Sequence, residues 1–320
     1  MVKNLPRAVE LPAGPGKVLS NLTQTARGQV RAGSVTTKLE PRGRFNHSHS
    51  FAYGELGAAA LHKKDQQQRD RSVPLDVSEL EEWDRRGLHN MQECAIYAKE
   101  IAEWLVAKEA SHRPRTGYMD SQPDINEKMR RILFDWLIEV HYKFKLRPQS
   151  LYLTQNVIDR FLSVHTVERQ KLQLIGISSL FIASKYEEIY APEVGDLSYI
   201  TDYAYKKKEI LDMEGTILSK LQFDVTVTYA YELMHRWGKI ARCSKKLMAL
   251  AEMMLDCSVL DYDLSVNELP SKIAAAALYL SLNLEAGHRK EAAWSSKNPS
   301  YEALRTHTKY PEEVLRPVAK

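Results

Sequence analysis

The sequence predicts an all-α protein in which a disordered basic head precedes two similar helical halves. Residues 1–75 are rich in Gly, Pro, Ser, Thr and Gln, whereas the remainder consists of long amphipathic segments separated by short breaks. An apolar segment with interspersed small residues occurs twice, at 172–184 and 271–282. This recurrence, about one helical domain apart, favours two related halves. The sequence predicts no convincing β-strand. The one stretch in which apolar and polar residues alternate, 223–229, is short enough to be a linker.

The head is expected to be disordered and positively charged. Up to Val73 it carries 12 basic and five acidic residues, a net charge of +7, which leaves −3 of the total of +4 for the remainder. It holds too few large apolar side chains to repay the entropy lost on ordering. Such a head serves either as a solubilising tail or in regulation and nuclear import, and its charge does not decide between these roles.

The first half is expected to hold about five helices in a compact unit, beginning with a helix at 91–110. The helix that follows Pro123 is apolar on two sides, which is typical of a central helix. Pro148 begins the next helix, because proline fits the first helical turn. Small residues at 172–184 let neighbouring helices approach closely, and 206–221 forms a further amphipathic helix.

The second half repeats this character. Residues 245–260 resemble the helix that begins at Pro148, and 271–282 is again apolar with small residues. The expected domains are a disordered basic region at 1–75, an N-terminal helix with its lead-in at 76–122, a first helical fold at 123–224 and a second at 225–320.

The sequence carries no recognisable catalytic or metal site. Residues 14–17 lack the spacing of a phosphate-binding loop, and neither Gly-x-Ser-x-Gly nor His-Glu-x-x-His occurs. Glu187 and Glu188 are adjacent, but neighbours on a helix point about 100° apart and do not converge as an acid and a base. The three cysteines are widely separated, and no apolar run approaches the roughly 20 residues of a membrane span. We therefore expect no enzymatic activity, no catalytic residue, no cofactor, no metal and no membrane partner.

Four charged residues interrupt apolar helical segments, namely Arg130, Asp159, Lys185 and Glu214. A charge among apolar side chains must be paired or hydrogen-bonded, because its desolvation otherwise costs several kcal/mol. Two acids and two bases could satisfy one another. Each could instead extend its polar end into solvent.

One segment carries a recognisable signature. Residues 129–140 read Met-Arg-Arg-Ile-Leu-Phe-Asp-Trp-Leu-Ile-Glu-Val, which resembles the opening helix of the cyclin box. Further stretches resemble the same family in order and at matching spacing, at 118–119, 122–125, 156–162, 171–176, 183–193, 199–202 and 209–214. The sequence thus resembles cyclins of the mitotic A/B type, most strongly over 118–224. The resemblance implies two tandem five-helix cyclin folds after an N-terminal helix.

The resemblance also implies a function, that of a regulatory subunit that binds and activates a cyclin-dependent protein kinase, helps recruit substrates and controls cell-cycle progression at G2/M. Arg130 and Asp159 would pair internally and hold two helices in register, while Lys185 and Glu214 would face the kinase. The surrounding kinase contacts are expected from Tyr186, Glu187, Ile189, Leu218, Phe223, Tyr97 and Ile101.

In similar cyclins a shallow groove captures Arg-x-Leu peptides of substrates and inhibitors. The matching residues here are Met129, Ile132, Leu133, Trp136, Glu139, Arg169 and Gln173. Glu139 would receive the basic residue of the peptide. A purely structural place in the core explains Leu133 and Trp136 equally well. Lys143 stands where some relatives carry an acid, so we expect an altered peptide preference.

The second half matches the family less well. The linker at 224–228 lacks the proline usual there, and the chain ends at Lys320 inside the expected last helix. Either the second fold is trimmed or the sequence is truncated. Residues 85–88, Arg-Arg-Gly-Leu, have the Arg-x-x-Leu form of a destruction signal, a pattern short enough to occur by chance.

Two other classes of function stay open. A cyclin-fold transcription factor would bind DNA through a basic core and carry a metal-binding ribbon, but the head has no cysteine and the remainder is slightly acidic. A helical scaffold without a kinase partner explains the helices but not Lys185 and Glu214. We therefore expect a kinase partner rather than nucleic acid, and a protein present in the nucleus and the cytoplasm.

Overall fold

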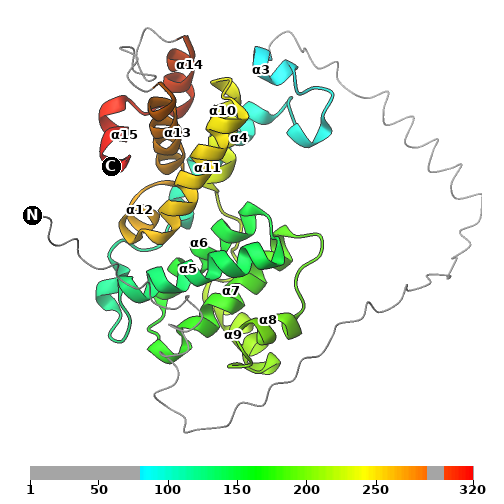
Figure 1. The fold of residues 1–320 in the computed structure, drawn as a ribbon, viewed down its shortest axis with the longest axis vertical. Helices are drawn as coiled ribbons and strands as arrows, with labels where there is room; N and C mark the ends of the chain where they lie inside the picture. Colours follow the sequence, from blue (N-terminus) through cyan, green and yellow to red (C-terminus); the bar gives the residue numbers. More distant parts are fainter. Residues whose placement is uncertain (1–79, 287–298, 320) are drawn as a thin grey trace, which may run out of the picture. The chain divides into compact units, whose positions relative to one another are not determined.

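The computed structural model describes residues 80–286 and 299–319, and every regular element in these ranges is a helix (Figure 1). The expected disordered region, 1–75, lies outside the described residues. The chain divides into two compact units, a smaller one at 26–96 and a larger one that contains 97–320. The all-α prediction is confirmed for the described chain.

The described part of the smaller unit is short and irregular. It contains α3 (Glu82–Arg85) and the 3-10 helix η3 (Met91–Glu93). The sequence predicted one continuous helix over 91–110, but Cys94 adopts a left-handed φ of 45° and ends η3. The α-helix α4 therefore begins only at Ala98 and runs to Lys108. Periodicity did not reveal this interruption, because the pattern of apolar residues continues through it.

The first repeat contains five α-helices, drawn in green in Figure 1, namely α5 (Glu127–Phe144), α6 (Pro148–Val164), α7 (Leu172–Glu187), α8 (Val194–Ile200) and α9 (Lys207–Lys220). Asn126 caps α5 by accepting a hydrogen bond from the backbone N–H of Met129, and Pro148 occupies the first turn of α6. The short helix α8 was not predicted from periodicity, since seven residues complete only two turns.

Helix α7 is the hub of the first repeat. It packs against α5, α6, α8 and α9, and its residues Leu174–Ser184 are all buried. Close approach requires a small residue at one contact, because a Cβ added to Gly176 would lie 2.7 Å from Cδ1 of Leu133 on α5. The apolar character around 172–184 thus reflects a helix surrounded by others.

The second repeat is built around α13 (Pro270–Ala286), which packs against α10 (Ala230–Ile240), α11 (Lys245–Leu260), α14 (Pro299–Thr308) and α15 (Glu312–Val318). The short helix α12 (Tyr262–Asn267) links α11 to α13. Like α7, α13 buries a run of small residues, since Ser271 and Ala274–Ala277 are all buried. The two recurring apolar segments of the sequence are therefore the two hub helices.

The two repeats and α4 are joined within the larger unit. Helix α5 contacts α11 and α12, and α10 contacts α6. After α4, the buried carboxylate of Glu109 accepts hydrogen bonds from the backbone N–H (2.8 Å) and the hydroxyl (2.7 Å) of Ser271, at the start of α13. A carboxylate suits this position, because a helix N-terminus carries partial positive charge.

Candidate functional site

Lys185 and Glu214 lie on adjacent helices and pair with each other. Lys185 is in the last turn of α7 and Glu214 in the middle of α9, and the lysine Nζ donates to Oε1 of the glutamate. The Lys185 Nζ also lies 4.1 Å from the centroid of the Phe181 ring, a cation–π contact. The side chain of Lys185 is 43% exposed and that of Glu214 is 11% exposed. The pair thus remains open to solvent on the lysine side.

Large apolar side chains are exposed near the ends of these two helices. Tyr186 and Ile189, at and beyond the end of α7, and Phe223, beyond the end of α9, are all exposed. Gln222 and Phe223 both adopt left-handed φ values, near 55° and 58°. The N–H of Phe223 is held by the carbonyl of Leu218 at 2.9 Å. This turn leaves the Phe223 ring exposed to solvent. Large apolar side chains that are exposed close to one another are typical of an interaction surface.

Two of the expected kinase contacts, Glu187 and Tyr186, are hydrogen-bonded within the chain. Glu187 accepts a hydrogen bond from the hydroxyl of Tyr229, and burial together with this bond raises the pKa of Tyr229. Leu218 is only partly exposed. In contrast, Tyr190 was not predicted from sequence but is 91% exposed, next to Ile189. The sequence could have indicated Tyr190, because this residue belongs to the stretch at 183–193 that resembles the cyclin box.

Helix α4 presents an unburied apolar face. None of its residues, Ala98–Lys108, is buried, and Ile101 and Trp104 are exposed, as is Tyr97 at its N-cap. The hydroxyl of Thr228, in the linker between the repeats, donates to the carbonyl of Leu105 at 2.8 Å. The same linker contacts α7, because Thr226 shares a hydrogen bond of 2.8 Å with Tyr186. The linker therefore joins α4 to the end of α7.

The residues of the expected peptide groove fall into two groups. Met129, Ile132 and Gln173 are partly exposed, and Glu139 and Arg169 are exposed. Leu133 and Trp136 are buried, with exposed fractions of 1% and 6%. In the free chain these two side chains belong to the core between α5 and its neighbours. The exposed part of the expected groove is therefore formed by the first group, whose members come from α5 (Met129, Ile132 and Glu139), from α7 (Gln173) and from the short 3-10 helix before α7 (Arg169).

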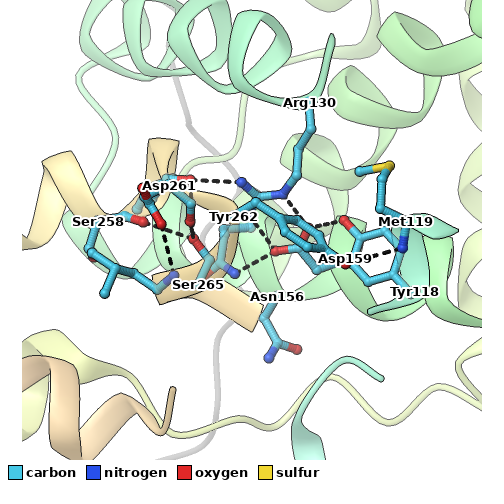
Figure 2. A network of polar contacts seen from close by, with 12 residues as sticks. Tyr118, Met119, Arg130, Asn156, Asp159, Ser258, Asp261, Tyr262 and Ser265 are labelled. Carbon is cyan, nitrogen blue, oxygen red and sulfur yellow. Dashed lines mark hydrogen bonds and ion pairs between the residues drawn. The ribbon is translucent and has the colours of Figure 1, made fainter. Parts of the chain in front are cut away.

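Arg130 and Asp159 form a fully buried ion pair between α5 and α6 (Figure 2). Arg130 Nε donates to Asp159 Oδ1 and Nη2 to Oδ2, both at 2.7 Å, which is the bidentate geometry of a strong pair. Burial by itself would lower the pKa of Arg130, but the Asp159 carboxylate raises it above its ordinary value. The hydroxyl of Tyr118 donates to the same Asp159 Oδ1 at 2.7 Å, and burial and this carboxylate raise the pKa of Tyr118.

The buried pair also reaches the second repeat, which the sequence did not predict. Arg130 Nη1 donates to the carbonyl of Val259 at 3.2 Å, and its guanidinium lies 5.8 Å from the Tyr262 ring centroid. Tyr262 in turn accepts a hydrogen bond of 3.1 Å from the backbone N–H of Met119 (Figure 2). One cluster therefore ties both repeats to the segment that precedes α5.

The sequence matches two family descriptions in succession, "Cyclin, N-terminal domain" over 100–226 and "Cyclin, C-terminal domain" over 227–320. The chain belongs to the cyclin family. Its curated relatives include Cyclin-B1-1 of Arabidopsis thaliana, with 40% identity over 82% of this chain and 56% of the relative. Another is G2/mitotic-specific cyclin-B2 of Oryzias latipes, with 39% identity over 77% of this chain and 60% of the relative. This cyclin thus spans little more than half the length of these relatives.

The fold of this cyclin is also that of a solved structure, a viral cyclin from herpesvirus saimiri. The two agree with a TM-score of 0.59 and 18% sequence identity, over 68% of this chain and 95% of the viral one. At this identity the likeness concerns the fold alone.

Two searches of the described residues gave negative results. None of the helices in the described ranges is long and apolar enough to cross a membrane. Among the same residues, no three His, Cys, Asp or Glu side chains are grouped so as to hold a metal ion.

Proposed function

We propose that this cyclin is a regulatory subunit that binds and activates a cyclin-dependent protein kinase in the G2/mitotic part of the cell cycle. The observation that carries the proposal is the surface around Lys185 and Glu214, where a solvent-accessible ion pair is flanked by the exposed side chains of Tyr186, Ile189 and Phe223. Exposed apolar clusters of this kind mark protein interfaces. The G2/mitotic assignment rests on the printed name of one relative.

Activation would be a shift of the kinase population. A protein kinase is competent when a glutamate of its regulatory helix pairs with the lysine that holds the ATP phosphates. If the cyclin surface binds only the conformation in which that helix is correctly placed, its binding energy stabilises the competent state. In this mechanism the cyclin contributes contacts and no catalytic group, so it is not itself an enzyme.

The test removes the ion pair and leaves the fold in place. Lys185→Ala combined with Glu214→Ala should abolish co-purification of a cyclin-dependent kinase from source cells and the associated kinase activity. The free energy of unfolding should change by less than about 1 kcal/mol, because partly exposed pairs contribute little to stability.

A matched control is the pair between Lys272 and Glu268, which joins the same residue types at 2.7 Å on the second repeat. Replacing both with alanine should leave kinase binding unchanged. Full kinase activation by the Lys185/Glu214 double variant would refute the proposed surface. If the unaltered cyclin co-purifies with no kinase, the result would favour the alternative function, a helical scaffold without a kinase partner.

We further propose that the exposed part of α5 binds Arg-x-Leu peptides. Met129 and Ile132 would contact the leucine, and Glu139 would pair with the basic residue. The positive charge of Lys143 would weaken the attraction for the basic residue of the peptide. The Lys143 Nζ lies 5.8 Å from the Tyr199 ring centroid, so this side chain has a cation–π partner.

Calorimetry with an Arg-x-Leu peptide tests this groove. Because Trp136 is buried, its replacement by alanine would cost about 3–5 kcal/mol of stability and confuse the result. Glu139→Lys is the sharper variant and should weaken peptide binding, whereas Glu302→Lys, at an exposed position of α14, should not. Equal peptide affinities of the two variants would exclude the groove.

Finally, we propose that the protein is present in the nucleus and the cytoplasm. Support comes from the +7 charge of the head, a pattern compatible with nuclear import. Fluorescence microscopy of the tagged full chain, compared with a chain that lacks residues 1–75, tests this. An unchanged distribution would show that the head does not direct import.

A further inference from the structure

A basic pocket lies at the ends of α6 and α9, next to the segment that leads from α4 towards α5. It has a volume of about 340 Å³ and is open to solvent. Four cationic side chains line it, those of Arg113, Arg115, Arg160 and Lys220, together with a single carboxylate, that of Asp224. The pocket therefore has an excess of positive charge.

The single carboxylate is already engaged. Asp224 Oδ2 lies 3.0 Å from His112 Nε2 and 3.8 Å from Arg160 Nη2. Arg160 Nη1 also donates to the backbone carbonyl of Asp224 at 2.9 Å. Asp224 thus neutralises Arg160, and no other carboxylate lines the pocket to pair with the remaining three cations.

Those three cations make no ion pair with any residue that the structure describes. Arg113 donates through Nη2 to the backbone carbonyls of Val266 (3.3 Å) and Asn267 (2.7 Å), and its buried Nε has no partner among the described residues. Arg115 donates to the hydroxyl of Ser121 at 2.6 Å, and Lys220 is exposed.

Outside the lining of the pocket, the negative charge of Glu109 acts on Arg113. Its carboxylate oxygens accept hydrogen bonds from Ser271, which do not remove that charge. Glu109 therefore offsets part of the charge of Arg113, and the positive excess of the pocket rests mainly on Arg115 and Lys220.

A structural explanation would be that the cations cap the negative C-terminal ends of the two helices. At each helix end at least one carbonyl already has another donor. At the end of α6, the side chain of Gln122 donates to the carbonyl of Leu162 at 2.7 Å. At the end of α9, the N–H of Leu221 donates to the carbonyl of Ile217 at 3.0 Å. These two carbonyls do not need a basic side chain as a cap.

We propose that this pocket binds the phosphate group of a phosphorylated serine or threonine in a partner protein. A phosphate dianion offers several acceptor oxygens, and guanidinium groups match them in bidentate geometry. The concave shape suits one anionic side chain rather than an extended polyanion. The head of this chain is not the expected occupant, because in its unphosphorylated form its net charge of +7 is repelled by the cations of the pocket. The proposal does not depend on kinase binding.

The experiment measures peptide binding to the purified full chain without a kinase. The probes are an oriented library of phosphoserine and phosphothreonine peptides, the same peptides without phosphate, and inorganic phosphate. Fluorescence anisotropy should detect phosphopeptide binding that is weakened on the order of tenfold or more by Arg115→Ala with Lys220→Ala, because the variant removes two charged hydrogen-bond donors from the phosphate.

The control variant removes the same two charges elsewhere. Lys246→Ala with Arg305→Ala alters exposed positions on α11 and α14 and should leave phosphopeptide affinity unchanged. Unfolding curves establish that both variants fold. The proposal is overturned if no phosphopeptide binds, if peptides without phosphate bind equally well, if only inorganic phosphate binds, or if both variants lose affinity equally.

Discussion

The Arg130–Asp159 pair and the Lys185–Glu214 pair join similar side chains in opposite surroundings. Arg130 and Asp159 are at most 1% exposed, make two bonds of 2.7 Å and are enclosed by Tyr118 and the second repeat. Lys185 is 43% exposed and makes a single bond to Glu214. The first pair has no route to another partner, whereas the second can exchange its partner at a surface.

The difference shows that burial, and not residue type, separates a structural pair from one that is available for binding. A buried charge that loses its partner stays desolvated, which costs several kcal/mol. A partly exposed charge that loses its partner is solvated by water instead. The two regions should therefore respond to substitution in different ways.

The largest expected effect is at the buried pair. Arg130→Ala should lower the free energy of unfolding by about 3–5 kcal/mol, because it leaves the Asp159 carboxylate buried without its cation. Chemical denaturation of the full chain measures this loss. The exposed neighbour Arg131 serves as the control, since Arg131→Ala should change stability by no more than about 0.5 kcal/mol. If Arg130→Ala and Arg131→Ala lowered the free energy of unfolding equally, burial would not be what separates a structural ion pair from an exposed one.

A smaller change in stability is expected from glycine substitutions, which compare the packed helix α7 with the exposed side of α9. Gly176→Ala should destabilise the protein by about 1–3 kcal/mol, because the new Cβ would meet the buried Leu133 at 2.7 Å. Gly215→Ala, next to Glu214, meets nothing within 4 Å and should stabilise the protein by about 0.4–1 kcal/mol. Melting curves measure both changes. A destabilising Gly215→Ala would show that this side of α9 is packed within the chain.

The smallest expected effect concerns Glu109, a buried charge held mainly by Ser271. Burial raises its pKa above the ordinary value of 4.5, although the Ser271 hydrogen bonds oppose this. The folded state then binds the proton more tightly than the unfolded state. The resulting contribution to stability is present below pH 4.5 and is lost as the pH rises through the raised pKa.

Glu109→Gln should abolish that part of the pH dependence. The free energy of unfolding of both forms, followed from about pH 4 to pH 8, measures it as the difference between two curves. Parallel curves would mean that the hydrogen bonds from Ser271 and the charge of Arg113 fully offset the effect of burial on the pKa of Glu109.

Sequence reasoning succeeded where the signal was local. The amphipathic segments became α5, α6, α7 and α9, and Pro148 marked the start of α6. It failed where a backbone conformation interrupted a continuing pattern, as at Cys94, or where a helix was short, as with α8. Helical periodicity records which face of one segment is apolar, but it does not record where a chain turns.

The candidate site was only partly accessible to the same reasoning. The four charges were visible as exceptions in apolar helices, and the resemblance to cyclins assigned Arg130 and Asp159 to an internal pair and Lys185 and Glu214 to the kinase surface. It did not predict that Lys185 and Glu214 pair with each other. Glu187 was expected at the kinase surface, and the structure adds a contact that the sequence did not indicate, since its carboxylate accepts a hydrogen bond from Tyr229, the N-cap residue of α10. Such a contact depends on how separate segments meet, and no property of the neighbouring residues indicates it.

The sequence by itself therefore determined the helical class, the two hub segments and the family, because each is written in local spacing and residue type. Tertiary structure alone decided which charges are sealed from water. Arg130 is buried because Val259, 129 residues away, and Tyr262 close over it, whereas nothing in the described chain covers Lys185 to the same extent. The energy of a charge depends on the solvent that surrounding segments exclude, and that exclusion exists only once the chain has folded.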